Sequence, residues 1–304
     1  MKKDIDICFE KEKIDWVIVE FPQMLGNIGR KIFDSGKLVL NQHNVEYKTL
    51  NNLAKSISNP IKRIIYSIEA KRLYQFEERY YRNFNIKLFT FVSIDDKAFF
   101  ERKFGIFNTL LVPVGAEVFD YEENKNNNNI ISYFGKMSYP PNAEAVIWFS
   151  NQVFPIIQKE VPESKFYVVG KDPSTELVSL LKSNPNIVVT GTVDKIEDYY
   201  KQTDLVVVPL SHGGGVKVKV LEALGYGKLV ISTAKGIEGT SFRNGIDILT
   251  AESAKEFAHI CINALQNLSC YEKVRRCGYE KIQRNFTWKA IVERFEQELN
   301  LLKS

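Results

Sequence analysis

Short apolar runs alternate with helical patterns along almost the whole chain, and this alternation limits the fold more than any other feature. Apolar runs of this length are typical of strands that are buried on both faces of a sheet. Strands that alternate with helices pair in parallel, and the helices cover both faces of the sheet. The sequence therefore predicts an α/β fold. The runs span 16–21, 37–43, 87–93, 109–114, 130–135, 165–170, 186–191, 204–210 and 228–233.

The alternation stops once, at the polar segment "DYEENKNNNN" of residues 120–129, which predicts a linker. Two series of strands and helices separated by a linker predict two Rossmann-like, doubly wound domains, one over residues 1–120 and one over residues 130–285. The end of the chain is predicted to be largely helical. Further helical patterns span 60–83, 142–159, 174–183, 195–202 and 216–225.

Composition and charge exclude several classes of protein. The net charge of +4 over 304 residues is too small to indicate nucleic-acid binding. No apolar run reaches the ~20 residues that span a bilayer, and the first residues lack the apolar core of a secretory signal. The three histidines are too scattered for a zinc site, and the four cysteines form no C-x-x-C pair. We therefore expect a cytoplasmic protein with reduced thiols and no metal site.

The segment "SHGGGVKVKVLEALGYGK" (211–228) follows a predicted strand and opens a predicted helix. Backbone N–H groups at a helix N-terminus favour an anion, and glycine lets a phosphate approach the backbone closely. Lys217 and Lys219 add positive charge, and Glu222 could accept hydrogen bonds from the hydroxyls of a ribose. The segment is not a P-loop, because no G-K-[ST] follows the glycines. On these residues alone, an ordinary glycine-rich loop with two solvated lysines is an equal alternative.

Further motifs occur in order around this segment: "YFGKMSYPPNAEAVIWF", "VVGKDP", "VTGTVD", "TDLVVVPLSHGGGVKVKVLEALGYGKLVISTAKGIEG" and "NFTW". Together they resemble the C-terminal, donor-binding half of retaining glycosyltransferases of family 4, which have the GT-B architecture. The resemblance covers residues 130–290 and is looser in the N-terminal half, through "NQHNVE", "FVSIDD" and "VPVGAEVF". It implies that residues 130–285 bind a nucleotide diphosphate sugar. It also implies that the helix of residues 286–304 crosses back to the first, acceptor-side domain.

The resemblance gives a role to each matching residue. Lys217 and Lys219 would hold the donor diphosphate, Glu222 would bind the ribose, and His43 would face the transferred sugar. His43, Lys217 and Glu222 are the predicted catalytic residues, and the alternative for His43 is a core or turn histidine. The resemblance implies no metal and no other cofactor. The other predicted donor-binding residues are Gly135, Lys136, Gly213, Gly214, Gly215 and Val216.

Two departures from the family put the activity in question. Many relatives carry an acid eight positions before the Glu222-type acid, where this chain has Gly214. The first predicted strand resembles a middle strand of the family's N-terminal domain, so we expect that domain to be incomplete. A partner subunit could complete it, since missing strands would leave an exposed sheet edge.

The helix predicted over residues 61–82 combines an apolar stripe with many basic residues. Residues 55–105 contain 11 Lys or Arg against 6 Asp or Glu. We interpret this segment as an amphipathic helix that faces the core and exposes its charged side. The alternative is docking onto an anionic membrane surface. The apolar stripe consists of Ile61, Ile64, Ile65, Ile68, Leu73 and Phe76.

The function that the resemblance implies is transfer of a hexose from a nucleotide diphosphate sugar to a glycan or lipid-linked acceptor, with retention of configuration. Such an enzyme would serve polysaccharide biosynthesis in the cytoplasm, with peripheral contact at the inner face of the membrane as a further option. One alternative is a non-catalytic, degenerate GT-B protein that acts as a binding or partner subunit. A sugar-nucleotide epimerase is a weaker alternative, because the sequence identifies no acids for its chemistry.

Overall fold

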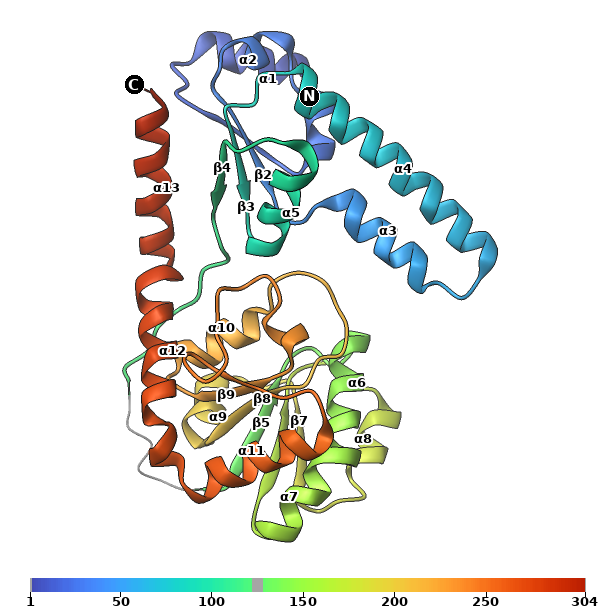
Figure 1. Cartoon of the computed structure of the whole chain (residues 1–304), viewed down its shortest axis with the longest axis vertical. Coiled ribbons are helices and arrows are strands. Elements are labelled where there is room, and N and C mark those ends of the chain that lie inside the picture. Colours follow the sequence, from blue (N-terminus) through green and yellow to red (C-terminus); the bar gives the residue numbers. More distant parts are fainter. Residues whose placement is uncertain (1, 122–127, 304) are drawn as a thin grey trace. The chain divides into compact units, whose positions relative to one another are not determined.

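The computed structural model describes residues 2–121 and 128–303, which form two compact units (Figure 1). Unit 1 comprises Met1–Pro113 together with Phe295–Ser304, and unit 2 comprises Val114–Arg294. Each unit has its own parallel sheet and its own hydrophobic core. The α/β fold class predicted from the alternation of strands and helices is confirmed.

The sheet of unit 1 has four parallel strands in the order β1-β2-β3-β4. Their pairing is in register, with Val39 opposite Leu88 on the neighbouring strand. Strand β1 lies at an edge of this sheet, and its Ile18 is 46% exposed. The strands are β1 (Val17–Glu20), β2 (Leu38–Gln42), β3 (Leu88–Phe91) and β4 (Thr109–Leu111).

Helices pack on the sheet of unit 1, and two of them, α4 and α5, begin at side-chain caps. The longest, α4, begins after Asn59, whose side chain accepts hydrogen bonds from the N–H groups of Ile61 and Lys62. Helix α5 begins after Ser93 in the same way and ends at Gly105, which has a left-handed conformation. The helical segments are α1 (Lys2–Lys11), η1 (Pro22–Asn27), α2 (Arg30–Asp34), α3 (Glu46–Ser56), α4 (Pro60–Asn83) and α5 (Ile94–Phe104).

The sheet of unit 2 has six parallel strands in the order β10-β9-β8-β5-β6-β7. The chain runs outward from β5 to β7 and then returns to the other side of β5 to form β8. The strand order therefore reverses between β5 and β8. The loops that follow these two strands meet at the carboxyl edge of the sheet. The strands are β5 (Ile130–Phe134), β6 (Lys165–Val169), β7 (Ile187–Gly191), β8 (Leu205–Val208), β9 (Leu229–Ser232) and β10 (Leu249–Thr250).

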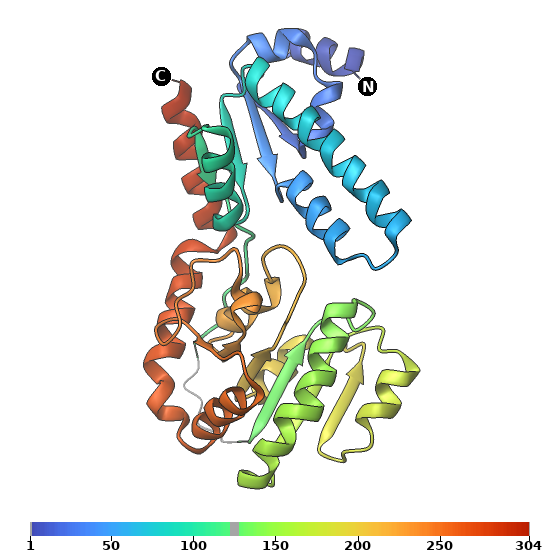
Figure 2. The ribbon, with the colours of Figure 1, turned by 45° about the vertical axis from the view of Figure 1, so that its right-hand side comes forward.

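Helices of unit 2 pack on its sheet, with α11 beside α7 and α10 beside α12 (Figure 2). The segment predicted as one helix over residues 142–159 is helical throughout, but a π-helical turn divides it. Pro155 follows this turn and has no N–H group to continue the regular hydrogen bonding. The helical segments are α6 (Pro140–Trp148), η2 (Phe149–Val153), α7 (Phe154–Glu160), α8 (Thr175–Leu181), α9 (Ile196–Gln202), α10 (Val218–Gly225), η3 (Ala234–Ile237), α11 (Ala254–Gln266), η4 (Leu268–Tyr271), α12 (Glu272–Asn285) and α13 (Trp288–Lys303).

The division between the units falls before the linker that the sequence predicts at 120–129, of which residues 122–127 lie outside the described part of the chain. Residues 114–119 belong to unit 2 because their backbone is bonded there. The N–H of Ala116 donates to the carbonyl of Phe286 at 2.7 Å, and that of Phe119 donates to Gly225 at 3.1 Å.

The last helix, α13, begins in unit 2, and its residues from Phe295 onward belong to unit 1. In unit 1 the side chain of Leu299 is buried in a small cluster with Val39 and Leu88. These two residues lie on the face of the sheet opposite to Leu38 and Leu40, which join the larger core of the unit. The end of α13 therefore covers one face of the sheet of unit 1.

The interpretation of α4 as a helix that faces the core along its length is wrong for its first half. Ala70, Glu77 and Tyr81 are buried, but the isoleucines of the first turns are between 49% and 68% exposed. The second half alone therefore packs on the core. Within the described part of the chain, no helix combines the length and the apolar character needed to cross a bilayer.

Candidate active site

Two loops of unit 2 meet at the carboxyl edge of its sheet, where the strand order reverses. One follows β5 and contains Gly135 and Lys136, and the other follows β8 and contains Gly213–Gly215. A Cβ atom on Gly213 would lie 3.4 Å from the hydroxyl of Tyr139, which places the two loops side by side. This edge is where open parallel sheets bind ligands.

The glycine loop needs glycine for its conformation. Gly213 and Gly215 have φ angles of 114° and 69°, which side chains rarely allow. Gly214 differs, because a Cβ atom there would meet nothing within 4 Å. The space next to Gly214 is therefore open. The side chain of Val216, a predicted donor-binding residue, is partly buried against the hydrophobic core of unit 2.

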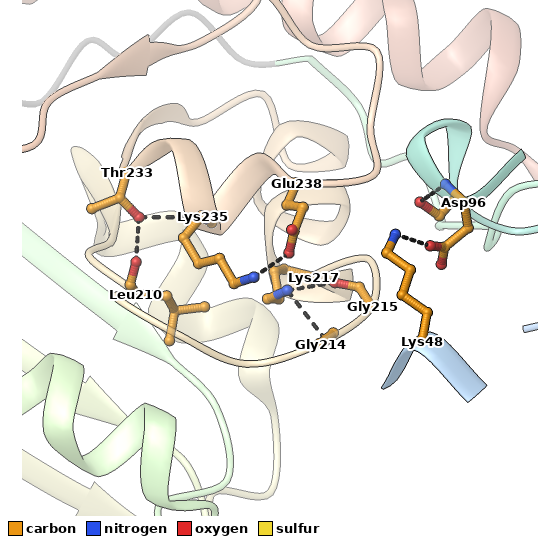
Figure 3. A network of polar contacts seen from close by, with 11 residues as sticks. Lys48, Asp96, Leu210, Gly214, Gly215, Lys217, Thr233, Lys235 and Glu238 are labelled. Carbon is orange, nitrogen blue, oxygen red and sulfur yellow. Dashed lines mark hydrogen bonds and ion pairs between the residues drawn. The ribbon is translucent and has the colours of Figure 1, made fainter. Parts of the chain in front are cut away.

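Lys217 lies at the N-cap of α10, which begins at Val218 and not at residue 216 as predicted. Its ammonium donates a hydrogen bond to the carbonyl of Gly214 at 3.2 Å and another to the carbonyl of Gly215 (Figure 3). Burial lowers the pKa of this side chain, and the carboxylate of Glu238 opposes that shift. In this conformation Lys217 holds its own loop together.

The segment after β9 lies next to this loop and is fixed by Thr233. Its hydroxyl donates to the carbonyl of Leu210 at 2.6 Å and accepts from the N–H of Gly236 at 3.1 Å (Figure 3). The bond to Leu210 ties the loop after β9 to the start of the loop after β8. The backbone around Lys217 is thus supported from two strands.

Lys219 has side-chain partners from other elements. Its ammonium lies 2.6 Å from the hydroxyl of Tyr133 on β5 and 2.7 Å from Oδ1 of Asn142 on α6. The Tyr133 hydroxyl itself donates to Asn142 Oδ1 at 2.7 Å. Burial and the nearby charge of Lys217 together lower the pKa of Lys219 to about 7, and the charge of Glu222 opposes that shift. Both of these hydrogen-bond partners are neutral, and among the described residues no acid in direct contact neutralises the charge of Lys219.

Gly135 brings the loop after β5 next to Lys219. A Cβ atom on Gly135 would lie 2.7 Å from the Lys219 ammonium. Gly170, at the end of the neighbouring strand β6, approaches still more closely, because its Cβ would lie 1.8 Å from the carbonyl oxygen of Gly135. Lys136 points to a different partner, with its ammonium 3.3 Å from Asp172. Its backbone carbonyl accepts from Asn142 at 2.8 Å.

Glu222, one turn beyond Lys219, lines a cavity of about 300 Å³. Burial raises the pKa of its carboxyl group, and the charge of Lys219 opposes that shift. The cavity combines acidic and aromatic side chains, so it offers both hydrogen-bond acceptors and flat apolar surfaces. Its lining residues are Gly115, Ala116, Glu117, Phe119, Ile196, Glu197, Tyr200, Val218, Glu222, Tyr226 and Trp288.

A stack of four aromatic rings includes three residues that line this cavity, Phe119, Tyr200 and Tyr226. Phe119 and Tyr226 stack at 3.8 Å between ring centres, Tyr226 and Tyr200 at 4.1 Å, and Tyr200 and Phe134 at 3.9 Å. The stack joins the chain after residue 114 to α9, α10 and β5. Packing between these four segments therefore holds the aromatic lining of the cavity in place.

His43 lies in unit 1, directly after β2, and its surroundings were not evident from the sequence. Its Nε2 lies 2.9 Å from Glu20, and its ring stacks on Phe21 with 4.5 Å between ring centres. Asn41 donates to the same carboxylate at 2.8 Å and accepts from the hydroxyl of Thr90 at 2.7 Å. The ends of β1, β2 and β3 therefore share one polar network, and His43 is its half-exposed member.

Beneath this edge of unit 1 lies a buried carboxyl group. Glu77 on α4 is fully buried, and neither of its oxygens has a hydrogen-bond partner among the described residues. Burial raises its pKa to about 8, so the group is mostly protonated at neutral pH. Tyr81 from the same helix donates to Gln42, the residue before His43, at 3.3 Å.

Comparison with known proteins assigns a family to part of unit 2. Residues 128–267 match the family model described as "Glycosyl transferases group 1". Most of unit 2 is therefore similar to group 1 glycosyltransferases. The matched residues include both loops at the carboxyl edge, Lys219 and Glu222.

Similarity to other proteins extends over almost the whole chain. An uncharacterized 44.6 kDa protein in the cps region of Klebsiella pneumoniae is 28% identical over 290 residues, which cover 92% of this chain and 73% of that protein. Among solved structures, sucrose-phosphate synthase from Thermosynechococcus elongatus aligns with a TM-score of 0.69 at 15% identity, over 99% of this chain and 77% of its own. HepE from Anabaena in complex with UDP aligns with a TM-score of 0.68 at 14% identity, over 98% and 81%. The fold is that of GT-B glycosyltransferases.

Unit 2 brings together most of the residues that the sequence singled out. Gly135, the glycine loop and Lys219 lie around one point, and Glu222 lies one turn further along α10. Lys136 and Val216 point to other partners, and His43 belongs to unit 1. Sequence reasoning missed Tyr133, Asn142, Glu20 and Phe21. The sequence places Tyr133 near the end of β5 and Asn142 near the start of α6, on either side of the loop in "FGKMSYPP". This position could have pointed to both residues.

Proposed function

We propose that the chain transfers a hexose from a nucleoside diphosphate sugar to a glycan or lipid-linked acceptor, with retention of anomeric configuration. The observation that carries the proposal is the position of Lys219, a cation with neutral partners, at the carboxyl edge of a glycosyltransferase domain. A diphosphate develops negative charge as it leaves the sugar. A fixed cation at that point stabilises the transition state more than the ground state.

The remaining residues would position the donor. Glu222 would accept hydrogen bonds from the ribose hydroxyls, and the aromatic walls of its cavity would contact the flat base. The glycine loop would offer its N–H groups to the phosphates, and Lys217 would join them by giving up its bonds to the loop carbonyls. His43 would contact the transferred sugar, oriented by Glu20 and Phe21. In this proposal the chain itself supplies the positive charge, and no metal or other cofactor is needed.

The similar proteins support a nucleoside diphosphate sugar as the donor and a role in polysaccharide biosynthesis. HepE, which shares the fold, has been crystallised with UDP and with UDP-glucose. The relative from Klebsiella pneumoniae is named for a cps region, which agrees with a role in polysaccharide biosynthesis. A nucleoside diphosphate hexose is therefore the first donor class to test.

A non-catalytic role as a binding or partner subunit is the second candidate. It is favoured by the bonds of Lys217 to its own loop and by the lack of an acid at residue 214. The open space beside Gly214 means that the fold does not forbid an acid there. Under this alternative the chain would bind nucleotide or glycan without turnover.

Thermal unfolding of the whole chain with UDP, GDP and their hexose conjugates is the test. A ligand at 100 times its dissociation constant stabilises the folded chain by about 2.7 kcal/mol. We expect one nucleotide series to raise the melting temperature and its conjugate to be turned over. The anomeric configuration of the glycosidic bond formed in the transfer product, read by NMR and compared with that of the donor, would then establish retention or inversion. Binding without any turnover would support the non-catalytic role, and no binding would contradict both.

A further inference from the structure

The tip of the α3–α4 hairpin carries an exposed apolar stripe. Four isoleucines of α4 stand three, four and seven positions apart, so they lie on one face of the helix. Leu53, on the neighbouring helix α3, is 45% exposed as well. We call these five residues the hairpin tip; the isoleucines are Ile61, Ile64, Ile65 and Ile68, with exposed fractions of 68%, 60%, 53% and 49%.

The hairpin tip is held by a rigid base. Helix α4 is capped by Asn59 and packs against α3, and its second half is anchored in the core of unit 1 through Tyr74, Phe76 and Tyr81. The isoleucines therefore belong to a formed helix whose other half is packed. An exposed aliphatic surface on such a helix is a site for an apolar partner.

Basic residues surround the hairpin tip. Residues 55–72 contain five Lys or Arg and one acid, Glu69, whose carboxylate is paired with Arg72 at 2.8 Å. In the part of the chain that the structure describes, the other four cations form no ion pair. They are Lys55, Lys62, Arg63 and Lys71, and all are exposed.

We propose that the hairpin tip binds the surface of an anionic lipid bilayer. The isoleucines would enter the boundary between headgroups and acyl chains, and the four cations would contact lipid phosphates. A second copy of this chain fits less well, because two such faces would bring like charges together and lysine is depleted from protein interfaces. This inference goes beyond the proposed function and does not rest on it.

Sedimentation of the whole chain with vesicles tests the proposal. One set of vesicles contains phosphatidylcholine alone, and the other contains phosphatidylcholine and phosphatidylglycerol in equal parts. We expect the chain to bind the anionic vesicles, with an affinity that falls as salt is added. I64S/I65S should lower this affinity by about tenfold or more, because it removes the two central apolar residues. K62Q/R63Q should lower it by a similar factor.

Matched controls separate the hairpin tip from general surface properties. Phe107→Ser removes a 75% exposed apolar residue elsewhere in unit 1, and K11Q/K13Q removes two other exposed charges. Both controls should bind vesicles like the unaltered chain. All variants should keep the same melting temperature and the same nucleotide binding, since the altered side chains are exposed. Vesicle binding and nucleotide binding are thus measured independently, and either can fail alone.

Three results would overturn the proposal. The first is no binding of the unaltered chain to anionic vesicles at low salt. The second is equal binding by the hairpin variants and the controls. The third is a dimer of the unaltered chain in sedimentation velocity that I64S/I65S converts to a monomer, because the apolar face would then be covered by a second copy.

Discussion

The ammonium of Lys219 lies 2.6 Å from the hydroxyl of Tyr133 and 4.2 Å from the centre of its ring. A cation in this position gains from the hydrogen bond and from the electron density of the ring. Neither interaction neutralises its charge. Burial lowers the pKa of Lys219 to about 7, so the side chain is close to its titration point at neutral pH. A bound diphosphate would raise that pKa again by its own negative charge.

Lys219→Met should weaken the binding of a nucleoside diphosphate by about tenfold to a hundredfold, since hydrogen bonds to charged groups contribute about 1.5–3 kcal/mol. The free energy of unfolding at pH 7 should not fall, because the variant removes the desolvation of a buried ammonium. Calorimetric titration with UDP and GDP measures the first effect, and urea unfolding measures the second. Lys201→Met, on the exposed end of α9, is the control and should change neither.

The affinity for UDP should depend on pH through Lys219. The diphosphate binds the protonated ammonium, whose pKa in the free protein is about 7. Affinity should therefore be full below this value and fall as the pH rises above it, by up to about tenfold per pH unit. Lys219→Met should show no such fall. An unaltered chain with constant affinity from about pH 6 to about pH 8, one unit on each side of this pKa, would contradict the assignment.

Glu222→Gln should weaken nucleotide binding by about tenfold, because the amide accepts hydrogen bonds from a ribose less strongly than a carboxylate does. Stability should be unchanged or slightly higher, since burial raises the pKa of Glu222 and so opposes its charge. The affinity of the unaltered chain should fall as the pH drops through that raised pKa and the carboxylate is protonated. Glu176→Gln, at a fully exposed acid of α8, provides a control.

Gly170→Ala should destabilise unit 2 by more than about 2 kcal/mol, because the new Cβ would overlap the carbonyl of Gly135. Gly214→Ala is the matched control, since its Cβ would meet nothing within 4 Å and its φ is not in the left-handed region. Urea unfolding, followed by circular dichroism, compares the two variants. Equal stability of Gly170→Ala and the unaltered chain would show that β5 and β6 separate more easily than their packing indicates.

Glu77→Gln should stabilise unit 1 at alkaline pH. The pKa of Glu77 is about 8 in the folded chain, well above its ordinary value, so the unfolded chain loses this proton first as the pH rises. The free energy of unfolding should therefore fall between about pH 4.5 and pH 8 and then level off. The amide has no proton to lose, so the variant should be about 2–4 kcal/mol more stable at pH 8.5 and nearly equal near pH 4.5. Parallel pH profiles for both chains would contradict this account.

The sequence by itself predicted the α/β fold, the parallel strands of both units and the glycine loop between β8 and α10. These features follow from local patterns, because strand length, apolar runs and glycine before a helix act over a few residues. The bounds of helices and units were predicted less accurately. Helix α10 begins at Val218 and not at residue 216, and the chain after residue 113 joins unit 2 through hydrogen bonds to Phe286 and Gly225. Those bonds join positions that no local pattern connects.

Only the tertiary structure distinguished Lys217 from Lys219. The two residues are of the same type and stand two positions apart. Lys217 donates hydrogen bonds to its own loop. Lys219 donates instead to Tyr133 and Asn142, which are 86 and 77 residues away in the sequence. The structure also showed which part of α4 is exposed. The sequence could not, because a helix has the same amphipathic pattern whether its apolar face packs on a core or faces solvent. Patterns in sequence record which residues share a face, and only the packing of distant segments determines what that face contacts.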